Sequence, residues 1–135
     1  MTKQKTYIID GINIQSLLDA FGQFEEFRVN TGTNQLRAGA IQAFEFSYEQ
    51  AWKIMKRLLD VRGQNLHSPR EIFRAAALEK FIDDPEEWIE YMYVRNITSH
   101  TYNDDYAEEV VDKFDEFSVL VKDFLKRIGV KDGAY

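Results

Sequence analysis

The sequence predicts an all-α fold, most simply an up-and-down four-helix bundle with one short additional helix. Only seven glycines and two prolines interrupt the 135 residues, which allows long helices. Apolar residues recur at three- and four-residue spacing through most of the chain, and alternation with a period of two persists nowhere. Apolar residues make up 44% of the chain and charged residues 30%, as in a folded globular protein. We therefore expect one helical domain over residues 1–135, with residues 1–9 irregular.

The first two helices are expected on either side of a polar turn. Apolar residues at helical spacing place the first helix at about residues 10–28. The sequence NTGTN at residues 30–34 is a turn cluster. The second helix then covers about residues 35–61, and Gly63 is placed to end it. Its apolar stripe consists of Ile41, Phe44, Tyr48, Trp52, Met55, Leu58 and Leu59.

The remaining helices begin at recognisable capping residues. Ser68 opens a capping box with proline at the first helical position, and Asp84 repeats this start signal. Asn103 or Asp104 can cap the last helix. These signals place the three helices at about residues 69–81, 85–99 and 104–128.

Composition and charge exclude several classes of protein. The chain has no cysteine, no apolar run long enough to cross a membrane and no signal-peptide pattern at its start, so we expect a cytoplasmic protein. The net charge of −6 argues against broad nucleic-acid binding, and we do not expect DNA as a partner. Residues 53–74 hold six basic and two acidic residues, whereas residues 83–116 hold twelve acidic and two basic ones. Such asymmetry indicates either an interaction surface or two solvated helix faces.

Sequence signatures of common catalytic sites are absent. The chain contains no P-loop and no GxGxxG, GxSxG or HExxH motif. It has two histidines, and they do not form the i, i+4 pair that binds a metal on a helix. We therefore expect neither a metal nor a cofactor.

The most informative stretch is RNITSHTY at residues 95–102. Arg95 continues the apolar stripe that begins at Trp88, so it should point toward a core or interface, where a guanidinium needs an acidic or phosphate partner. His100 lies five positions later, about 140° around an ideal helix, so the two meet only if the helix loosens. A histidine near a helix C-terminus is favoured in its charged form and suits acid catalysis or anion binding. The alternative is that His100 merely caps a helix end while Arg95 ties helices together.

Four charged residues share one face of the second helix: Glu45, Glu49, Lys53 and Lys56. The spacing favours a pair between Glu49 and Lys53, while Glu45 and Glu49 repel each other. Paired carboxylates are tolerated best when a cation faces them, and Arg95 is a candidate for that cation. The alternative is an exposed polar face beside the aromatic stripe.

Three sequence blocks occur together in this order: AFEFSYEQAWKIMK (43–56), SPREIFR (68–74) and DPEEWIEYMYVRNITSHTY (84–102). With these blocks the chain resembles the nucleotidyltransferase substrate-binding proteins, small helical partners of minimal nucleotidyltransferases within the wider HEPN superfamily. The resemblance runs from about Ala40 to the last helix. It implies a homodimer of four-helix-bundle type that binds a separate nucleotidyltransferase chain.

Within the HEPN superfamily, the resemblance also implies a metal-independent ribonuclease site. Its R-x4-6-H motif lies at the dimer cleft, and here Arg95 and His100 match the motif while Asn96 matches its polar neighbour. The resemblance implies that an RNA 2′-hydroxyl attacks the adjacent phosphate, with His100 acting on the proton and Arg95 stabilising the developing charge. In the toxin branch the motif extends to a tyrosine that the partner nucleotidyltransferase adenylylates, and Tyr102 matches that tyrosine.

Three functions are compatible with these residues. The first is a non-catalytic subunit that binds a substrate or nucleotide for a nucleotidyltransferase; the second is a ribonuclease toxin of a toxin–antitoxin pair, silenced by adenylylation of Tyr102; the third is a purely structural helical dimer. The chain lacks the catalytic pattern of a nucleotidyltransferase, so it should not transfer nucleotides alone. Its acidity disfavours the approach of RNA, which places the binding subunit first. The candidate binding residues are Glu45, Glu49, Lys53, Arg74 and Tyr102.

Overall fold

The apolar stripes fold into helices that share one core, as seen in a computed structural model that describes residues 6–135. In chain order its elements are β1 (Ile8–Ile9), β2 (Ile12–Asn13), α1 (Gln15–Phe27), α2 (Asn34–Val61), α3 (Pro69–Leu78), α4 (Pro85–Ile97), a 3₁₀ turn (Thr98–His100), α5 (Asp104–Val111) and α6 (Phe114–Arg127).

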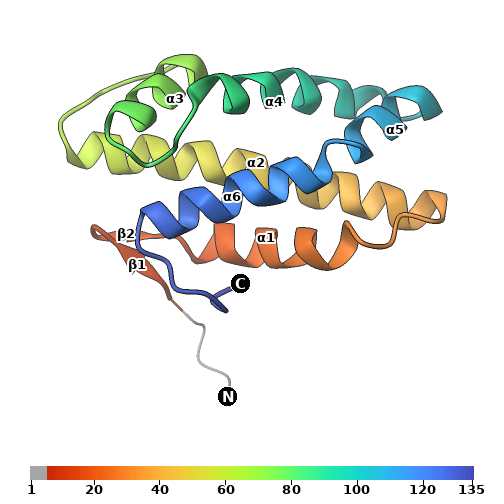
Figure 1. Ribbon diagram of the computed structural model, residues 1–135, viewed down its shortest axis with the longest axis horizontal. Helices are drawn as coiled ribbons and strands as arrows, with labels where there is room; N and C mark the ends of the chain where they lie inside the picture. Colours follow the sequence, from red (N-terminus) through yellow and green to blue (C-terminus); the bar gives the residue numbers. More distant parts are fainter. Residues whose placement is uncertain (1–5) are drawn as a thin grey trace.

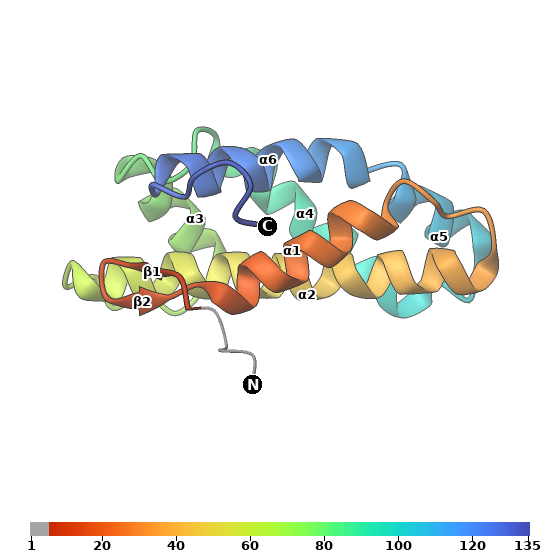
Figure 2. The ribbon, with the colours of Figure 1, turned by 90° about the horizontal axis from the view of Figure 1, so that it is seen from below.

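The long helices α1, α2, α4 and α6 run up and down in alternating directions, with α3 and α5 at opposite ends of the bundle (Figure 1). Seen from below in Figure 2, α1 lies toward the viewer, with α2 to one side of it and α6 to the other. This arrangement confirms the predicted all-α bundle, although two short helices accompany the four long ones where one was expected. None of the helices within residues 6–135 combines the length and apolar character that crossing a membrane requires.

The N-terminal segment forms a β-hairpin, so the prediction of a helix from residue 10 is wrong. Strands β1 and β2 pair antiparallel, and α1 begins only at Gln15. Asp10 and Gly11 connect the strands with φ angles of 50° and 80°. Positive φ at both central residues is the geometry that Asp-Gly favours in tight hairpins, and it ends any helical path through this dipeptide. Residues 8–9 are therefore a strand, while residues 1–5 of the segment expected to be irregular lie outside the described residues.

The expected last helix is divided into α5 and α6. The division lies at Asp112 and Lys113, which keep right-handed backbone angles, and the side chain of Tyr91 contacts the chain there. Its hydroxyl donates a hydrogen bond to the carbonyl oxygen of Lys113 at 2.8 Å. The periodic apolar stripe continues across the break, and for that reason the sequence pattern does not reveal it.

Helix α3 also ends earlier than expected, at Leu78 rather than near Phe81. Lys80 adopts a left-handed backbone with φ of 65°, and the amide of Phe81 bonds back to the carbonyl of Ala76 at 2.9 Å. The left-handed residue and this hydrogen bond together cap the end of the helix. Glycine is the usual residue at such a left-handed position. The turn also buries the ring of Phe81.

An aromatic cluster joins the four long helices. Phe117 of α6 lies 5.4 Å from Phe24 of α1 and 4.8 Å from Phe44 of α2, measured between ring centroids. Trp88 of α4 lies 6.3 Å from the same ring, largely edge-on. All four rings are essentially inaccessible to solvent. Aromatic contacts of this kind contribute beyond their area of burial, so this cluster positions the helices that carry the site.

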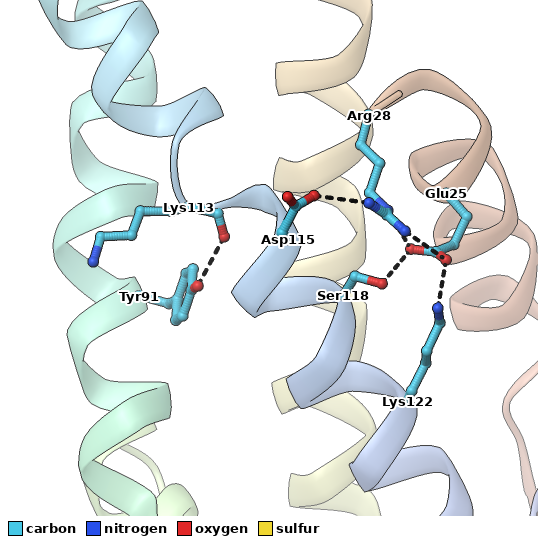
Figure 3. A network of polar contacts seen from close by, with 7 residues as sticks. All are labelled: Glu25, Arg28, Tyr91, Lys113, Asp115, Ser118 and Lys122. Carbon is cyan, nitrogen blue, oxygen red and sulfur yellow. Dashed lines mark hydrogen bonds and ion pairs between the residues drawn. The ribbon is translucent and has the colours of Figure 1, made fainter. Parts of the chain in front are cut away.

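A polar network clamps α1 to α6 (Figure 3). The carboxylate of Glu25 accepts hydrogen bonds from Ser118 at 2.6 Å and Arg28 at 2.8 Å, and Lys122 lies 2.9 Å from its other oxygen. Arg28 also reaches Asp115 at 2.8 Å. Burial alone would raise the pKa of Glu25, but these hydrogen bonds outweigh burial and hold the pKa below its ordinary value. Glu25 therefore stays ionised and fully paired in the folded chain.

Candidate functional site

Arg95 lies in the last turn of α4, where the helix gives way to the 3₁₀ turn. The hydroxyl of Thr98 donates to the carbonyl oxygen of Arg95 at 2.6 Å and accepts from its Nη1 at 3.1 Å. This reciprocal contact fixes the guanidinium at the helix end. The expected loosening after Arg95 is therefore present, since α4 ends at Ile97 and a 3₁₀ turn carries the chain to His100.

Arg95 faces the two carboxylates of α2. Its Nε donates to Oε1 of Glu49 at 3.2 Å, and its Nη1 lies 3.8 Å from Oε2 of Glu45. Each of the three side chains is about one third exposed. Arg95 therefore faces the paired carboxylates, as the helical spacing had suggested. Two carboxylates against one guanidinium leave a local excess of one negative charge.

A pocket of about 140 Å³ opens between α2 and α4 beside Arg95. Trp52, Met92 and Pro69 supply apolar walls, and Glu49, Arg95 and Asn96 supply polar groups. Tyr48 also lines the pocket, and its hydroxyl is buried without a hydrogen-bond partner among residues 6–135. Such a group is rare in folded proteins because a buried hydroxyl is normally paired.

Sequence reasoning placed Tyr48 and Trp52 in the core stripe and missed their place in this pocket. Tyr48 is only 3% exposed, so its ring belongs to the core. Its hydroxyl is unusual for a core group because it has no hydrogen-bond partner among the described residues. Trp52 is half-buried at the edge of the stripe. A large polar-tipped aromatic one helical turn from a charged pair is the signal that could have found both residues.

The other residues of the proposed motif lie at the surface. His100 and Asn96 are exposed, and no hydrogen bond within residues 6–135 joins Arg95 to His100. Tyr102 is 85% exposed, and its hydroxyl lies 3.5 Å from Nδ1 of His100. The ring of Tyr106 lies 6.2 Å from the His100 ring, measured between centroids. One chain therefore holds a charged pocket at Arg95 and a separate, solvent-exposed group of rings around His100.

Lys53 and Arg74 do not join this site. Lys53 is exposed, and Glu49 pairs with Arg95 instead of making the expected helical pair with Lys53. Arg74 of α3 lies beside the first turn of α4, where it reaches Glu86 at 4.0 Å. Arg95 follows Glu86 by nine positions on α4, which is roughly 14 Å along the axis. In a single chain Arg74 therefore lies apart from Arg95, and its part in binding stays a prediction.

An acidic groove of about 430 Å³ lies between α4 and α6. Glu87, Glu90 and Glu116 line it together with Val119. Surrounding carboxylates add to burial in raising the pKa of Glu87. None of the residues singled out from the sequence lies in this groove. Within residues 6–135 there is also no cluster of three or more histidine or carboxylate side chains that could hold a metal ion.

Comparison with known proteins places this geometry in a family context. The sequence profile of the family described as "Nucleotidyltransferase substrate binding protein like" matches residues 12–129. A relative from Haemophilus influenzae, named "Probable ribonuclease HepT", is 40% identical over 89 residues. That match covers 62% of this chain, and the chain spans 61% of the length of the relative.

Two solved structures share the fold. One, from Haemophilus influenzae, is described as revealing the fold of a substrate binding domain of a nucleotidyltransferase; it is 32% identical with a TM-score of 0.78, covering 86% of this chain and 98% of that one. A protein from Thermus thermophilus has a TM-score of 0.77 at 24% identity, covering 84% of this chain and 98% of its own. The second likeness concerns the fold alone.

Proposed function

Because the chain belongs to the nucleotidyltransferase substrate binding protein like family, we propose that it is the non-catalytic, substrate- or nucleotide-binding subunit of a two-component minimal nucleotidyltransferase. In this role it forms a homodimer and binds a separate nucleotidyltransferase chain, which supplies the transfer chemistry. The structural relative described as a substrate binding domain of a nucleotidyltransferase supports this proposal.

The observation that carries the proposal is the state of Arg95. A ribonuclease needs a cation that is free to stabilise negative charge on a phosphorane. Here Glu45 and Glu49 already neutralise the guanidinium and leave one excess negative charge. An RNA phosphate brought to this position would meet repulsion as well as attraction. The arrangement suits a bound group that offers hydrogen-bond donors.

The face that carries Arg95 also offers a surface for the homodimer. Phe46, the neighbour of Glu45 on α2, leaves 52% of its surface exposed. Trp52 and Met92 are half-buried at the nearby pocket. Partly exposed aromatic and Met side chains are enriched at protein interfaces. We place the dimer contact on this α2–α4 face.

Co-expression with a minimal nucleotidyltransferase from the same organism tests the proposal. Size-exclusion chromatography with light scattering should show a dimer of the chain alone and a larger, stable complex with the nucleotidyltransferase. A monomer at micromolar concentration would contradict the homodimer. Separate elution of the two chains would contradict the two-component enzyme.

The second candidate is a metal-independent ribonuclease toxin. Two observations favour it. The motif is intact and the Tyr102 hydroxyl lies beside Nδ1 of His100. A relative is named a probable ribonuclease. In this function Arg95 and His100 act across the dimer cleft, with Asn96 supporting them. The exposure of Tyr102 would make it accessible to adenylylation, which adds bulk and negative charge beside His100. RNA cleavage by the purified chain separates this function from the binding subunit.

A further inference from the structure

The groove between α4 and α6, called the α4–α6 groove below, combines an apolar lining with acidic edges. It has a volume of about 430 Å³, and Tyr91, Val119 and Leu120 form its apolar part. Val119 leaves 66% of its surface exposed. A lone exposed valine is ordinary on a protein surface, but this one lies in a hollow that has room for a second apolar group to cover it.

The two sides of the α4–α6 groove are held in place by the fold. The hydroxyl of Tyr91 on α4 donates to the carbonyl oxygen of Lys113, the residue before α6, at 2.8 Å (Figure 3). Phe117 of α6 packs 5.3 Å from the ring of Tyr91, measured between ring centroids. The groove is therefore formed in the free chain, and a partner does not have to open it.

Carboxylates line the groove on both helices. Glu87 and Glu90 come from α4, and Glu116 comes from α6. A second hollow of about 200 Å³ shares Glu87, Val119 and Leu120 with the first, so the groove continues toward the start of α4. The continuation adds three further carboxylates: Asp83, Asp84 and Asp123. Six carboxylates therefore lie along one continuous surface.

Too few cations accompany these carboxylates. Lys113 lies 3.2 Å from Glu90 and 3.9 Å from Glu116, and Arg127 lies 2.8 Å from Asp123. Six carboxylates and two cations leave an excess of four negative charges, in a chain whose net charge is −6. Five acidic residues of the stretch 83–116 thus gather at one hollow, which favours an interaction surface over a solvated helix face.

Glu87 shows the consequence of this excess in the free chain. No ion pair within residues 6–135 involves its carboxylate. Burial, followed by the charges of four neighbouring carboxylates, raises its pKa. The acidic groups therefore repel one another, and positive charge from outside the chain relieves that repulsion. A single metal ion does not supply it, because the described chain holds no group of three or more histidine or carboxylate side chains suited to bind one.

The dimensions of the groove suit a helix as its occupant. Glu116 and Asp123 are seven positions apart on α6, which is roughly 10 Å or about two helical turns. An amphipathic helix lying in such a groove buries its apolar side against the apolar lining. Lys and Arg side chains on its flanks extend their aliphatic stems over the same lining and bring their charges to the carboxylates at the edges.

We infer that the α4–α6 groove docks a basic amphipathic helix of the partner nucleotidyltransferase. The apolar side of that helix covers Val119 and Leu120, and its Lys or Arg side chains pair with Glu87 and Glu116. The inference rests on the proposed function, because it assigns the surface that the nucleotidyltransferase binds. No residue of the groove lines the α2–α4 pocket, so the face placed at the homodimer contact stays free for a second copy.

Fluorescence anisotropy with a labelled synthetic helix tests the groove itself. The probe is a Leu/Lys peptide of about four helical turns with every Leu on one face, and a scrambled peptide of the same composition lacks that face. The wild-type chain should bind the probe roughly tenfold more tightly than the scrambled peptide. Glu87→Lys with Glu116→Lys should weaken binding roughly tenfold, because two attractions become repulsions. Val119→Ser should weaken it roughly threefold, because less apolar area is buried.

Asp19→Lys with Glu26→Lys is the matched control. Both residues are exposed on α1, which does not line the groove. Each substitution adds two charges, so this pair takes the net charge from −6 to −2, as the groove pair does. The control should bind the probe within about twofold of the wild type. Equal loss in the two pairs, or equal binding of the scrambled peptide, would reduce the effect to overall charge and overturn the inference.

Circular dichroism checks that each variant folds. If the lysine pair in the groove does not fold, Glu87→Gln with Glu116→Gln takes its place and should weaken binding of the probe roughly threefold. Unchanged binding in this neutral pair would overturn the inference.

The complex with the nucleotidyltransferase tests the occupant. Its affinity should fall roughly tenfold in the groove pair and stay unchanged in the control pair. Unchanged affinity in the groove pair would overturn the inference and leave the proposed function standing. No complex with the wild type would contradict the proposed function and the assigned partner, while the peptide still decides whether the groove docks a basic helix. Loss of the homodimer in the groove pair, seen by light scattering, would assign the groove to a second copy and overturn the inference.

Discussion

Two polar clusters connect helices in this chain, and they differ in how completely their groups are paired. Between α1 and α6, Glu25 is satisfied by Arg28, Ser118 and Lys122 (Figure 3). Between α2 and α4, the cluster around Arg95 has an excess carboxylate and leaves the buried hydroxyl of Tyr48 unpaired. Each is built on a guanidinium facing carboxylates, so residue type alone does not distinguish them.

The difference leads us to assign one cluster to the fold and the other to the proposed site. A closed network gains hydrogen bonds on folding, and these stabilise the folded chain. An open cluster loses solvation without full compensation, a cost that a folded protein tolerates where binding later supplies the missing partner. The Glu25 cluster is therefore structural, and the Arg95 cluster is the candidate site.

The largest expected effect concerns the core on which both clusters depend. Trp88→Ala should reduce the free energy of unfolding by roughly 3–5 kcal/mol, because the indole is 1% exposed and packs against Phe73 and Phe124 as well as Phe117. Guanidinium unfolding followed by circular dichroism measures it. A loss below about 1 kcal/mol would mean that the clusters, rather than the core, hold the helices together.

The next effect contrasts one carboxylate from each cluster. Glu25→Ala should cost about 2 kcal/mol at pH 7, because it removes the acceptor of several charge-assisted hydrogen bonds. Glu49→Ala should cost less than about 1 kcal/mol, since Arg95 keeps Glu45 and both side chains are partly solvated. Urea unfolding of the two variants gives the comparison. Equal losses would remove the distinction between the clusters.

The pH dependence of stability follows from the lowered pKa of Glu25. Its ordinary value is 4.5 and its folded value lies below that, so the unfolded chain binds the proton more readily. Its contribution should be complete above the unfolded pKa and disappear as the pH falls through the folded pKa. The stability difference between wild type and Glu25→Ala, measured from pH 7 down to pH 3, should therefore shrink below about pH 4.5. A difference that stays constant would contradict the paired state of Glu25.

The smallest expected effect separates the two buried tyrosines. Tyr91→Phe should cost about 1 kcal/mol, because it leaves the carbonyl of Lys113 without this donor at the break between α5 and α6. Tyr48→Phe should change stability by less than about 0.5 kcal/mol or increase it, since no hydrogen bond is lost. Differential scanning calorimetry resolves both. A clear loss in Tyr48→Phe would show that its hydroxyl has a partner in the free chain.

Much of the fold could be predicted because its signals are local. Ser68 and Asp84 accept the capping hydrogen bonds expected at the starts of α3 and α4, and apolar spacing located α2 within one residue at its start. The hairpin was missed although Asp10-Gly11 is a strong turn signal, since four strand residues are too few to show alternation. At the break before α6, Lys113 accepts a hydrogen bond from Tyr91 of another helix, a contact that no local pattern contains.

Those parts of the site that follow from helical spacing could be predicted. Those that depend on how deeply a polar atom is buried could not. Helical spacing placed Glu45 and Glu49 on one face and pointed Arg95 inward, and the structure joins them. Arg74 lies apart from them in one chain, and charge along the sequence could not show this because it gives no position along α4. The hydroxyl of Tyr48 could not be found, since a stripe indicates that a ring is buried but not whether its polar tip is paired.

RNA cleavage by the purified chain tests the central claim most directly, namely that the Arg95 cluster binds and does not catalyse. The wild type and His100→Ala are incubated with RNA in EDTA, and the ends of any products are examined for 2′,3′-cyclic phosphate. The intact mass of the wild type is checked for an adenylyl group on Tyr102. An unmodified chain that leaves RNA intact is the result that the account predicts. Cleavage to cyclic phosphate ends that disappears in His100→Ala would contradict it and establish the ribonuclease.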